Sequence, residues 1–168
     1  MTITVDVDNA SASDDIPDPA VMRRWVAAAL AGQREEAELA VRIVDEAESA
    51  ELNGLYRHKP GPTNVLSFPA ELPDEIDIPL LGDLVVCAPV VSREAVEQDK
   101  TLDAHWAHML VHGTLHLLGH DHTDDTEADI MEALETRIIT GLGFPPPYET
   151  PNPPAEGSGP PIARADHE

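Results

Sequence analysis

The chain has 168 residues, of which 32 are acidic and 10 are lysine or arginine, so its formal net charge is -22. This length is enough for one domain with a substantial hydrophobic core. The strong acidic bias excludes a general basic surface that would attract nucleic-acid phosphates without specificity. DNA is therefore not expected as a partner, and any contact with RNA must be local.

The sequence also predicts a location for the protein. Cys87 is the only cysteine, so no disulfide can form within the chain, which fits a reducing compartment. The N-terminus lacks the basic and then apolar pattern of a secretory signal. No apolar stretch approaches the roughly 20 residues of a transmembrane helix. We therefore expect a cytoplasmic protein without a membrane partner.

Hydrophobic periodicity predicts strands early in the chain and helices in its second half. Ile3, Val5 and Val7 alternate as in a half-buried strand, whereas Asp18 and Pro19 are typical of a helix cap and first turn. The expected strands are 2–7, 38–44, 63–68 and 80–87, the last broken at Gly82-Asp83, and the expected helices are 19–32, 46–56, 92–98, 102–118 and 125–143. This order favours the α+β class, with helices packed on a single mixed sheet of about four strands.

The composition changes near the C-terminus. Eight of the 16 prolines lie in the last 24 residues, among Gly, Ser and few apolar residues. Such a segment cannot bury enough apolar surface to become ordered. We expect one domain over residues 1–148, followed by a disordered, proline-rich and acidic tail over residues 149–168.

The most informative stretch runs from His112 to His122. His112 and His116 are four residues apart, so on a helix they lie on one face, one turn from each other. Gly119 can take the left-handed conformation that ends a helix and reverses the chain, which would bring His122 back toward the first two. Three imidazoles with an open fourth position are typical of a catalytic zinc site. We therefore predict one zinc ion bound by His112, His116 and His122.

The helix around these histidines is predicted to be central and buried, because apolar residues flank the histidine face on both sides. A solvated polar helix end would be the ordinary interpretation of such histidines, but uncompensated polar groups are costly on a buried helix. The metal site is accordingly expected at the end of this helix. His105 and His108 are interpreted as packing or supporting groups, and His120 as an exposed residue of the turn.

The spacing His-x3-His-x2-Gly-x2-His also occurs in metzincin peptidases. Those enzymes have a glutamate directly after the first histidine, where it acts as the general base. Here that position is Gly113, which has no side chain. A metallopeptidase therefore remains an alternative, but a disfavoured one. Asp83 and Asp121 are weaker candidates for a residue that orients a water molecule or an imidazole.

A second informative segment, residues 52–69, leads from a helix into a strand. Arg57 and Lys59 form a rare basic spot within this acidic chain. Arg57 has two interpretations at this point. It is either a surface residue that pairs with one of the many carboxylates, or a clamp for phosphate, whose geometry the guanidinium group matches.

Several linked motifs resemble the YbeY family, whose members are bacterial metal-dependent endoribonucleases that act as rRNA maturation factors. They include His-Gly-x-Leu-His-Leu-x-Gly-x-Asp-His at 112–122, Asn-x-x-Tyr-Arg at 53–57 and Pro-Thr-Asn-Val-Leu-Ser-Phe-Pro at 62–69, within a match over about residues 35–148. The resemblance implies zinc at His112, His116 and His122 and a functional role for Arg57.

The resemblance also implies a function. It is cleavage of single-stranded RNA in the 3′-end maturation of 16S rRNA of the small ribosomal subunit, and in ribosome quality control. A ribosome assembly factor whose metal is mainly structural remains a further alternative.

Overall fold

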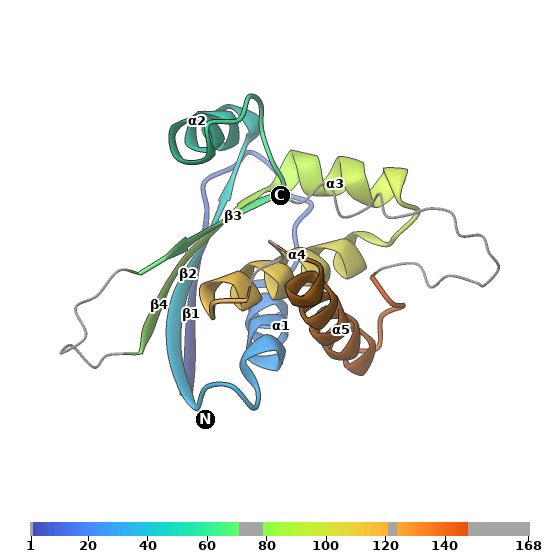
Figure 1. Cartoon of the computed structure of the whole chain (residues 1–168). Coiled ribbons are helices and arrows are strands. Elements are labelled where there is room, and N and C mark those ends of the chain that lie inside the picture. The colour runs from blue at the N-terminus through green and yellow to red at the C-terminus, as the bar shows by residue number, and fades with distance from the viewer. Residues whose placement is uncertain (1, 71–78, 121–123, 148–168) are drawn as a thin grey trace.

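The computed structural model describes residues 2–70, 79–120 and 124–147, and contains one mixed four-stranded sheet in this part of the chain (Figure 1). The spatial order of the strands is β1-β2-β4-β3. Strands β1, β2 and β4 are parallel, and β3 pairs with β4 in the antiparallel sense. The strands are β1 (Thr2–Asn9), β2 (Glu36–Val44), β3 (Val65–Pro69) and β4 (Leu80–Cys87).

Five helices accompany the sheet in the described residues, which confirms the predicted α+β class. They are α1 (Pro19–Leu30), α2 (Glu46–Arg57), α3 (Ala88–Glu97), α4 (Leu102–Leu117) and α5 (Asp125–Gly141). The larger core lies between one face of the sheet and α1, α4 and α5, whereas a smaller apolar cluster lies on the other face, which α2 partly covers (Figure 1). The expected domain limit at residue 148 and the tail at 149–168 lie outside the described residues.

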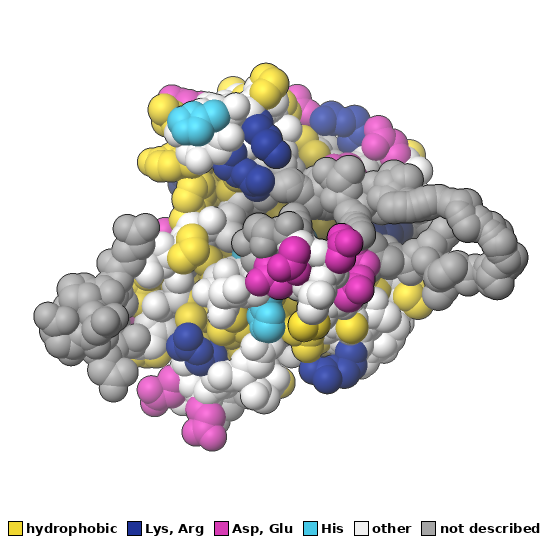
Figure 2. All heavy atoms as spheres, viewed as in Figure 1, with side chains coloured by type: hydrophobic (Ala, Val, Ile, Leu, Met, Phe, Trp, Pro, Cys, Tyr) yellow, Lys and Arg dark blue, Asp and Glu magenta, His cyan; other side chains and the backbone are white. Residues whose placement is uncertain are grey.

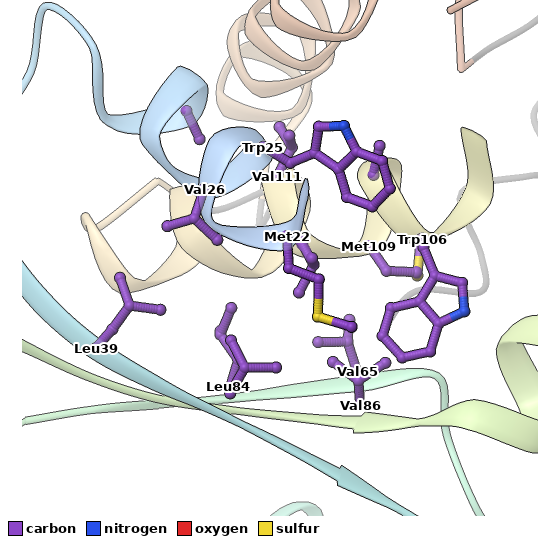
Figure 3. Close-up of a cluster of buried hydrophobic side chains, with 14 of the residues drawn as sticks. Met22, Trp25, Val26, Leu39, Val65, Leu84, Val86, Trp106, Met109 and Val111 are labelled. Atoms are coloured by element: carbon purple, nitrogen blue, oxygen red, sulfur yellow. The ribbon is translucent and has the colours of Figure 1, made fainter. Parts of the chain in front are cut away.

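Helix α4 is the central buried element, as the sequence predicts. Apolar side chains surround it, and the side chain of Thr101 caps its first turn by accepting a hydrogen bond from Ala104 N at 3.1 Å. Figure 3 shows Trp106, Met109 and Val111 of α4 together with Met22, Trp25 and Val26 of α1 and with Val65, Leu84 and Val86 of the sheet. Burial fixes the positions of His105, His108 and His112, whereas His116, near the end of α4, is only partly buried.

Gly113 allows α4 to lie directly against the sheet. A Cβ atom at this position would be 2.8 Å from Leu84 Cδ2 and 3.3 Å from Ser67 Oγ. The Ser67 hydroxyl also donates a hydrogen bond of 3.1 Å to the Gly113 carbonyl oxygen. A larger residue at position 113 would therefore push α4 away from β3 and β4.

The structure corrects several predicted boundaries. Helix α3 begins at Ala88 rather than Ser92, because Pro89 lies in its first turn, where the missing N–H costs nothing. Strand β4 is not broken at Gly82-Asp83. It continues, and the pairing with β2 instead shifts register between Glu38 and Leu39. Strand β3 begins at Val65, two residues later than predicted, and the backbone O and N of Thr63 instead bond to Ser49 Oγ of α2 at 3.0 and 2.9 Å.

Candidate metal centre

The histidines of α4 meet at its C-terminal end, where the chain reverses. Gly119 has a φ of +103°, the left-handed conformation that the sequence predicts. Its N–H donates to His116 O at 3.0 Å, and the next N–H, from His120, donates to Leu115 O at 3.0 Å. His112 and His116 lie one turn apart, with ring centroids 4.6 Å apart and ring planes at 81°. The pair therefore stands at the end of the buried helix, as expected.

Glu135 of α5 completes a buried polar cluster with two of these histidines. Its Oε2 is 2.6 Å from His112 Nδ1, and its Oε1 is 3.0 Å from His108 Nε2. The exposed fraction of Glu135 is 0%. Burial alone would raise the pKa of Glu135, but His112 and His108 outweigh it and hold this pKa well below its usual range. Glu135 is therefore an ionised carboxylate that accepts hydrogen bonds from two imidazoles.

The charge state of His108 follows from its surroundings. Burial lowers the pKa of His108 to about 4, although the carboxylate of Glu135 acts in the opposite direction. His108 is thus a neutral imidazole at neutral pH, with one N–H that can donate to Glu135. The sequence predicts His108 as a packing or supporting group rather than a ligand. The contact with Glu135 fits a supporting role, but His108 is also one of three described residues that could hold a metal ion, so its role stays a prediction.

A second carboxylate–histidine contact lies at the other end of α4. His105 Nε2 is 2.8 Å from Glu94 Oε1, and Asn64 Nδ2 donates to the same carboxylate oxygen at 3.1 Å. His105 is buried, so its predicted packing role agrees with the structure. The two contacts tie α4 to α3 and to α5.

One group of three described residues has the geometry to hold a metal ion. His108, His112 and Glu135 each offer one ligand atom, and these atoms lie within 4.8 Å of one another. This group differs from the predicted ligand set of His112, His116 and His122. His112 and His116 are adjacent in the structure, whereas His122 lies outside the described residues. His120 lies on the turn, partly exposed, with Nε2 3.0 Å from Gln33 Oε1.

Sequence reasoning did not identify Glu135 as part of the site. A signal exists: Met131 and Ile139, four residues on either side, share the buried face of α5 with it. A glutamate on such a face needs a partner, because an unpaired buried charge is very costly. The sequence alone does not reveal that this partner is a histidine pair on α4.

Arg57 lies at a different place in the fold. It is the last residue of α2 and is exposed, and His58 ends the helix in the left-handed conformation. Figure 2 shows Lys and Arg side chains and a histidine gathered over the part of the molecule that α2 occupies. Asp83 is an exposed residue of β4, and Asp121 lies outside the described residues. The basic spot that the sequence indicates thus lies at the surface, at the C-terminal end of α2 and the start of the loop after it.

The architecture and the histidine–carboxylate cluster together define an α+β protein with a candidate metal centre. Comparison with known families assigns it further, because residues 6–143 match the family described as Endoribonuclease YbeY. The chain belongs to this family, as the sequence motifs suggested. It is accordingly a nuclease of the hydrolase class, an endoribonuclease of rRNA processing with RNA as its substrate.

A solved structure shares the fold. The chain is similar to the solution structure of TM1509 from Thermotoga maritima, with 23% sequence identity and a TM-score of 0.57. The similarity covers 84% of this chain and 89% of that one. Within the residues that the structure describes, no helix is both long and apolar enough to span a membrane.

Proposed function

We propose that the protein is a zinc-dependent endoribonuclease that cleaves single-stranded RNA, matures the 3′ end of 16S rRNA in the small ribosomal subunit, and acts in ribosome quality control in the cytoplasm. The observation that supports it best is the pair His112–His116 at the end of a buried helix in a chain of the endoribonuclease YbeY family. On this proposal residues 1–148 form the catalytic domain and residues 149–168 a tail.

The proposed ligands of one zinc ion are His112, His116 and His122. Neutral imidazoles are preferred ligands of zinc, and three of them leave a position for the substrate. Two ligand atoms on a tetrahedral zinc ion, each about 2.0–2.1 Å from the metal, lie roughly 3.3 Å apart. The 2.6 Å between His112 Nδ1 and Glu135 Oε2 is shorter than this and is a hydrogen-bond distance. This favours the three-histidine set over a set that includes Glu135.

The chain's own residues supply the rest of the proposed chemistry. When bound, the zinc ion supplies Lewis acidity, which makes water more acidic and neutralises charge on a phosphate. Arg57 supplies a planar guanidinium group that can bind two phosphate oxygens, where negative charge grows during cleavage. Asp83 and Asp121 remain candidates for orienting water.

A peptidase of the metzincin type is disfavoured by packing as well as by sequence. The position after His112 faces Leu84 and Ser67 so closely that even a Cβ atom would collide. A glutamate there would have to displace the sheet. No observation favours the assembly-factor alternative, in which the metal is mainly structural.

The test uses the purified full chain with three substrates: a single-stranded RNA, the same strand in a duplex, and a peptide library. Each is incubated with the zinc-loaded protein, with chelator, and with chelator followed by added zinc. We expect cleavage of the single strand alone, its loss with chelator, and its return with zinc.

Three other results would overturn the proposal. Cleavage of peptides would favour the peptidase. RNA cleavage that survives chelation would exclude zinc dependence. Stoichiometric zinc without cleavage of any RNA, including small-subunit rRNA precursor, would favour the assembly factor.

A further inference from the structure

The carboxylate of Glu135 is buried at a cost that the fold must offset. Its exposed fraction is 0%, and it lies between Met131 and Ile139 on the buried face of α5. Transferring a carboxylate into such surroundings is unfavourable unless hydrogen bonds satisfy its oxygens. An apolar residue would fill the same place on α5 without this cost. The two contacts to α4 therefore indicate that Glu135 has a role beyond packing.

The contact with His112 decides which of its ring nitrogens bears the proton. A carboxylate oxygen accepts hydrogen bonds and does not donate them, so the 2.6 Å between Glu135 Oε2 and His112 Nδ1 assigns the hydrogen to Nδ1. A neutral imidazole has one N–H, so Nε2 then has the lone pair that a metal ligand requires. In folded proteins, histidine ligands of zinc commonly donate their second ring nitrogen to a carboxylate in this way.

His108 takes the other oxygen of the same carboxylate and does so through the opposite nitrogen, Nε2, at 3.0 Å. Two imidazoles from successive turns of α4 thus hold both oxygens of Glu135. A carboxylate held at both oxygens cannot rotate, so the ring of His112 is fixed in turn.

We infer that Glu135 is a positioning residue of the metal centre: it fixes the Nδ1–H tautomer and the orientation of His112, and His108 anchors the carboxylate that does so. This inference rests on the proposed metal site, because it assigns Nε2 of His112 as the ligand atom. It differs from the arrangement in which Glu135, His108 and His112 themselves bind the metal.

The first test needs no substitution. In the full-length, metal-free protein at neutral pH, the imidazole nitrogen chemical shifts of His112 should show a protonated Nδ1 and an unprotonated Nε2. A His112 that carries its proton on Nε2, or that samples both tautomers equally, would overturn the inference.

The second test measures zinc affinity in competition with a chromophoric chelator. In Glu135→Gln the amide can accept from only one of the two imidazoles, so we expect zinc binding to weaken about 10–100-fold. Glu135→Asp is a second variant, which should also weaken binding because the shorter side chain cannot reach both histidines. Glu94→Gln is the matched control. It alters the same kind of contact at His105, and zinc affinity should stay within about twofold of the parent chain.

The outcomes separate the possible roles of Glu135. An unchanged zinc affinity in both Glu135 variants would overturn the inference. A loss as complete as that of His116→Ala would also overturn it, because Glu135 would then be a ligand. An equal loss in Glu94→Gln would show a general effect of helix packing and would likewise overturn the inference.

Because these tests measure tautomers and zinc affinity, they do not depend on RNA cleavage. A parent chain that binds zinc but cleaves no RNA would break the proposed function and leave the role of Glu135 standing. The reverse result, cleavage by the parent chain with no effect of Glu135 on zinc affinity, would break only the inference.

Discussion

The two carboxylate–histidine contacts of α4 use the same chemical groups in different surroundings. Glu94 of α3 meets one histidine, His105, and its side chain is 20% exposed. Glu135 of α5 meets two histidines, and its side chain is 1% exposed. Glu94 also accepts from Asn64, whose backbone oxygen accepts from Cys87 N at 2.9 Å. The Glu94 contact therefore joins α3, α4 and the sheet, whereas the Glu135 contact ends on a candidate metal ligand.

The surroundings of the histidine, rather than the carboxylate–histidine pair itself, decide what such a buried contact does. Burial raises the pKa of Glu94, yet His105 and Asn64 together hold it below its ordinary value, as the histidines do for Glu135. Both carboxylates are thus ionised acceptors. Only Glu135 contacts an imidazole, that of His112, which lies beside another histidine of the proposed site.

The largest expected effect is on zinc content, and it differs between substitutions at the two ends of α4. His116→Ala should abolish stoichiometric zinc and lower the melting temperature in zinc-containing buffer, because metal binding contributes to folding stability. His105→Gln, at the Glu94 end, should keep one zinc ion per chain. Metal analysis of the purified variants checks both. Full zinc occupancy in His116→Ala would remove this histidine from the ligand set.

The next effect concerns acid stability of the metal-free protein. The pKa of His108 is about 4 in the folded chain and 6.5 when unperturbed, so between these values only the unfolded chain takes up the proton. The contribution of neutral His108 to the free energy of unfolding is therefore fully present above pH 6.5, and it is lost as the pH falls toward 4. The difference between the two pKa values corresponds to roughly 3 kcal/mol.

Denaturant titrations at several pH values between 7 and 4 measure this loss. His112 and Lys100 also disfavour a positive charge on His108, whereas Glu135 favours it. His108→Gln should flatten the dependence, and His105→Gln should leave it. If the metal-free chain has the same free energy of unfolding at pH 6.5 and pH 4.5, the assignment of the acid sensitivity to His108 and its contact with Glu135 is wrong.

Arg57 takes part in neither carboxylate–histidine contact, so its substitution should leave both contacts intact. Arg57→Ala is expected to keep zinc and the fold but to cleave single-stranded RNA about 100-fold more slowly or worse, as for loss of a group that stabilises transition-state charge. Arg57→Lys should restore only part of the rate, because a point charge lacks the bidentate geometry. Lys59→Ala is the matched control on the same loop. Cleavage at the parent rate by Arg57→Ala would mean that the guanidinium group has no role in the reaction.

The smallest expected effect lies outside both contacts, where Gly113 of α4 meets the sheet. Gly113→Ala should destabilise the protein by about 1–3 kcal/mol, because the added carbon would press on Leu84 and Ser67. Gly141→Ala is a control for which the opposite change in stability is expected. A Cβ atom added at this position would have no other atom within 4 Å, so the substitution should stabilise α5 by up to about 1 kcal/mol. Thermal unfolding of both variants measures the difference. A neutral Gly113→Ala would show that α4 can move away from the sheet.

Local patterns in the sequence were enough to predict α4, its histidine pair and the turn at Gly119. Each depends on residues within about one or two helical turns, where periodicity and glycine conformation are informative. The bounds of β4 agree with the prediction of a strand over 80–87, although the predicted break at Gly82-Asp83 is absent. The start of α3 was missed because β4 passes into the helix without a loop, so no turn residue marks the boundary.

The supporting half of the site could not be predicted in this way. Glu135 reaches His112 from another helix, 23 residues along the chain, and only tertiary packing brings them together. The role of Arg57 and the third predicted ligand, His122, stay predictions. The register shift in the β2–β4 pairing was likewise not predictable, because register depends on both strands at once.

The way in which α2 is held has a consequence for local opening. Its buried residues, Ser49 and Asn53, are polar, and they bond to Thr63 and to Gly61 O at 2.9–3.0 Å. Segments with few buried apolar contacts open with a lower free energy than the core. Amide hydrogens of α2 should therefore exchange with solvent faster than those of α4. The basic spot would then lie in the part of the fold that opens more readily. It would be able to adjust its position to an RNA strand while the histidines of α4 stay in place.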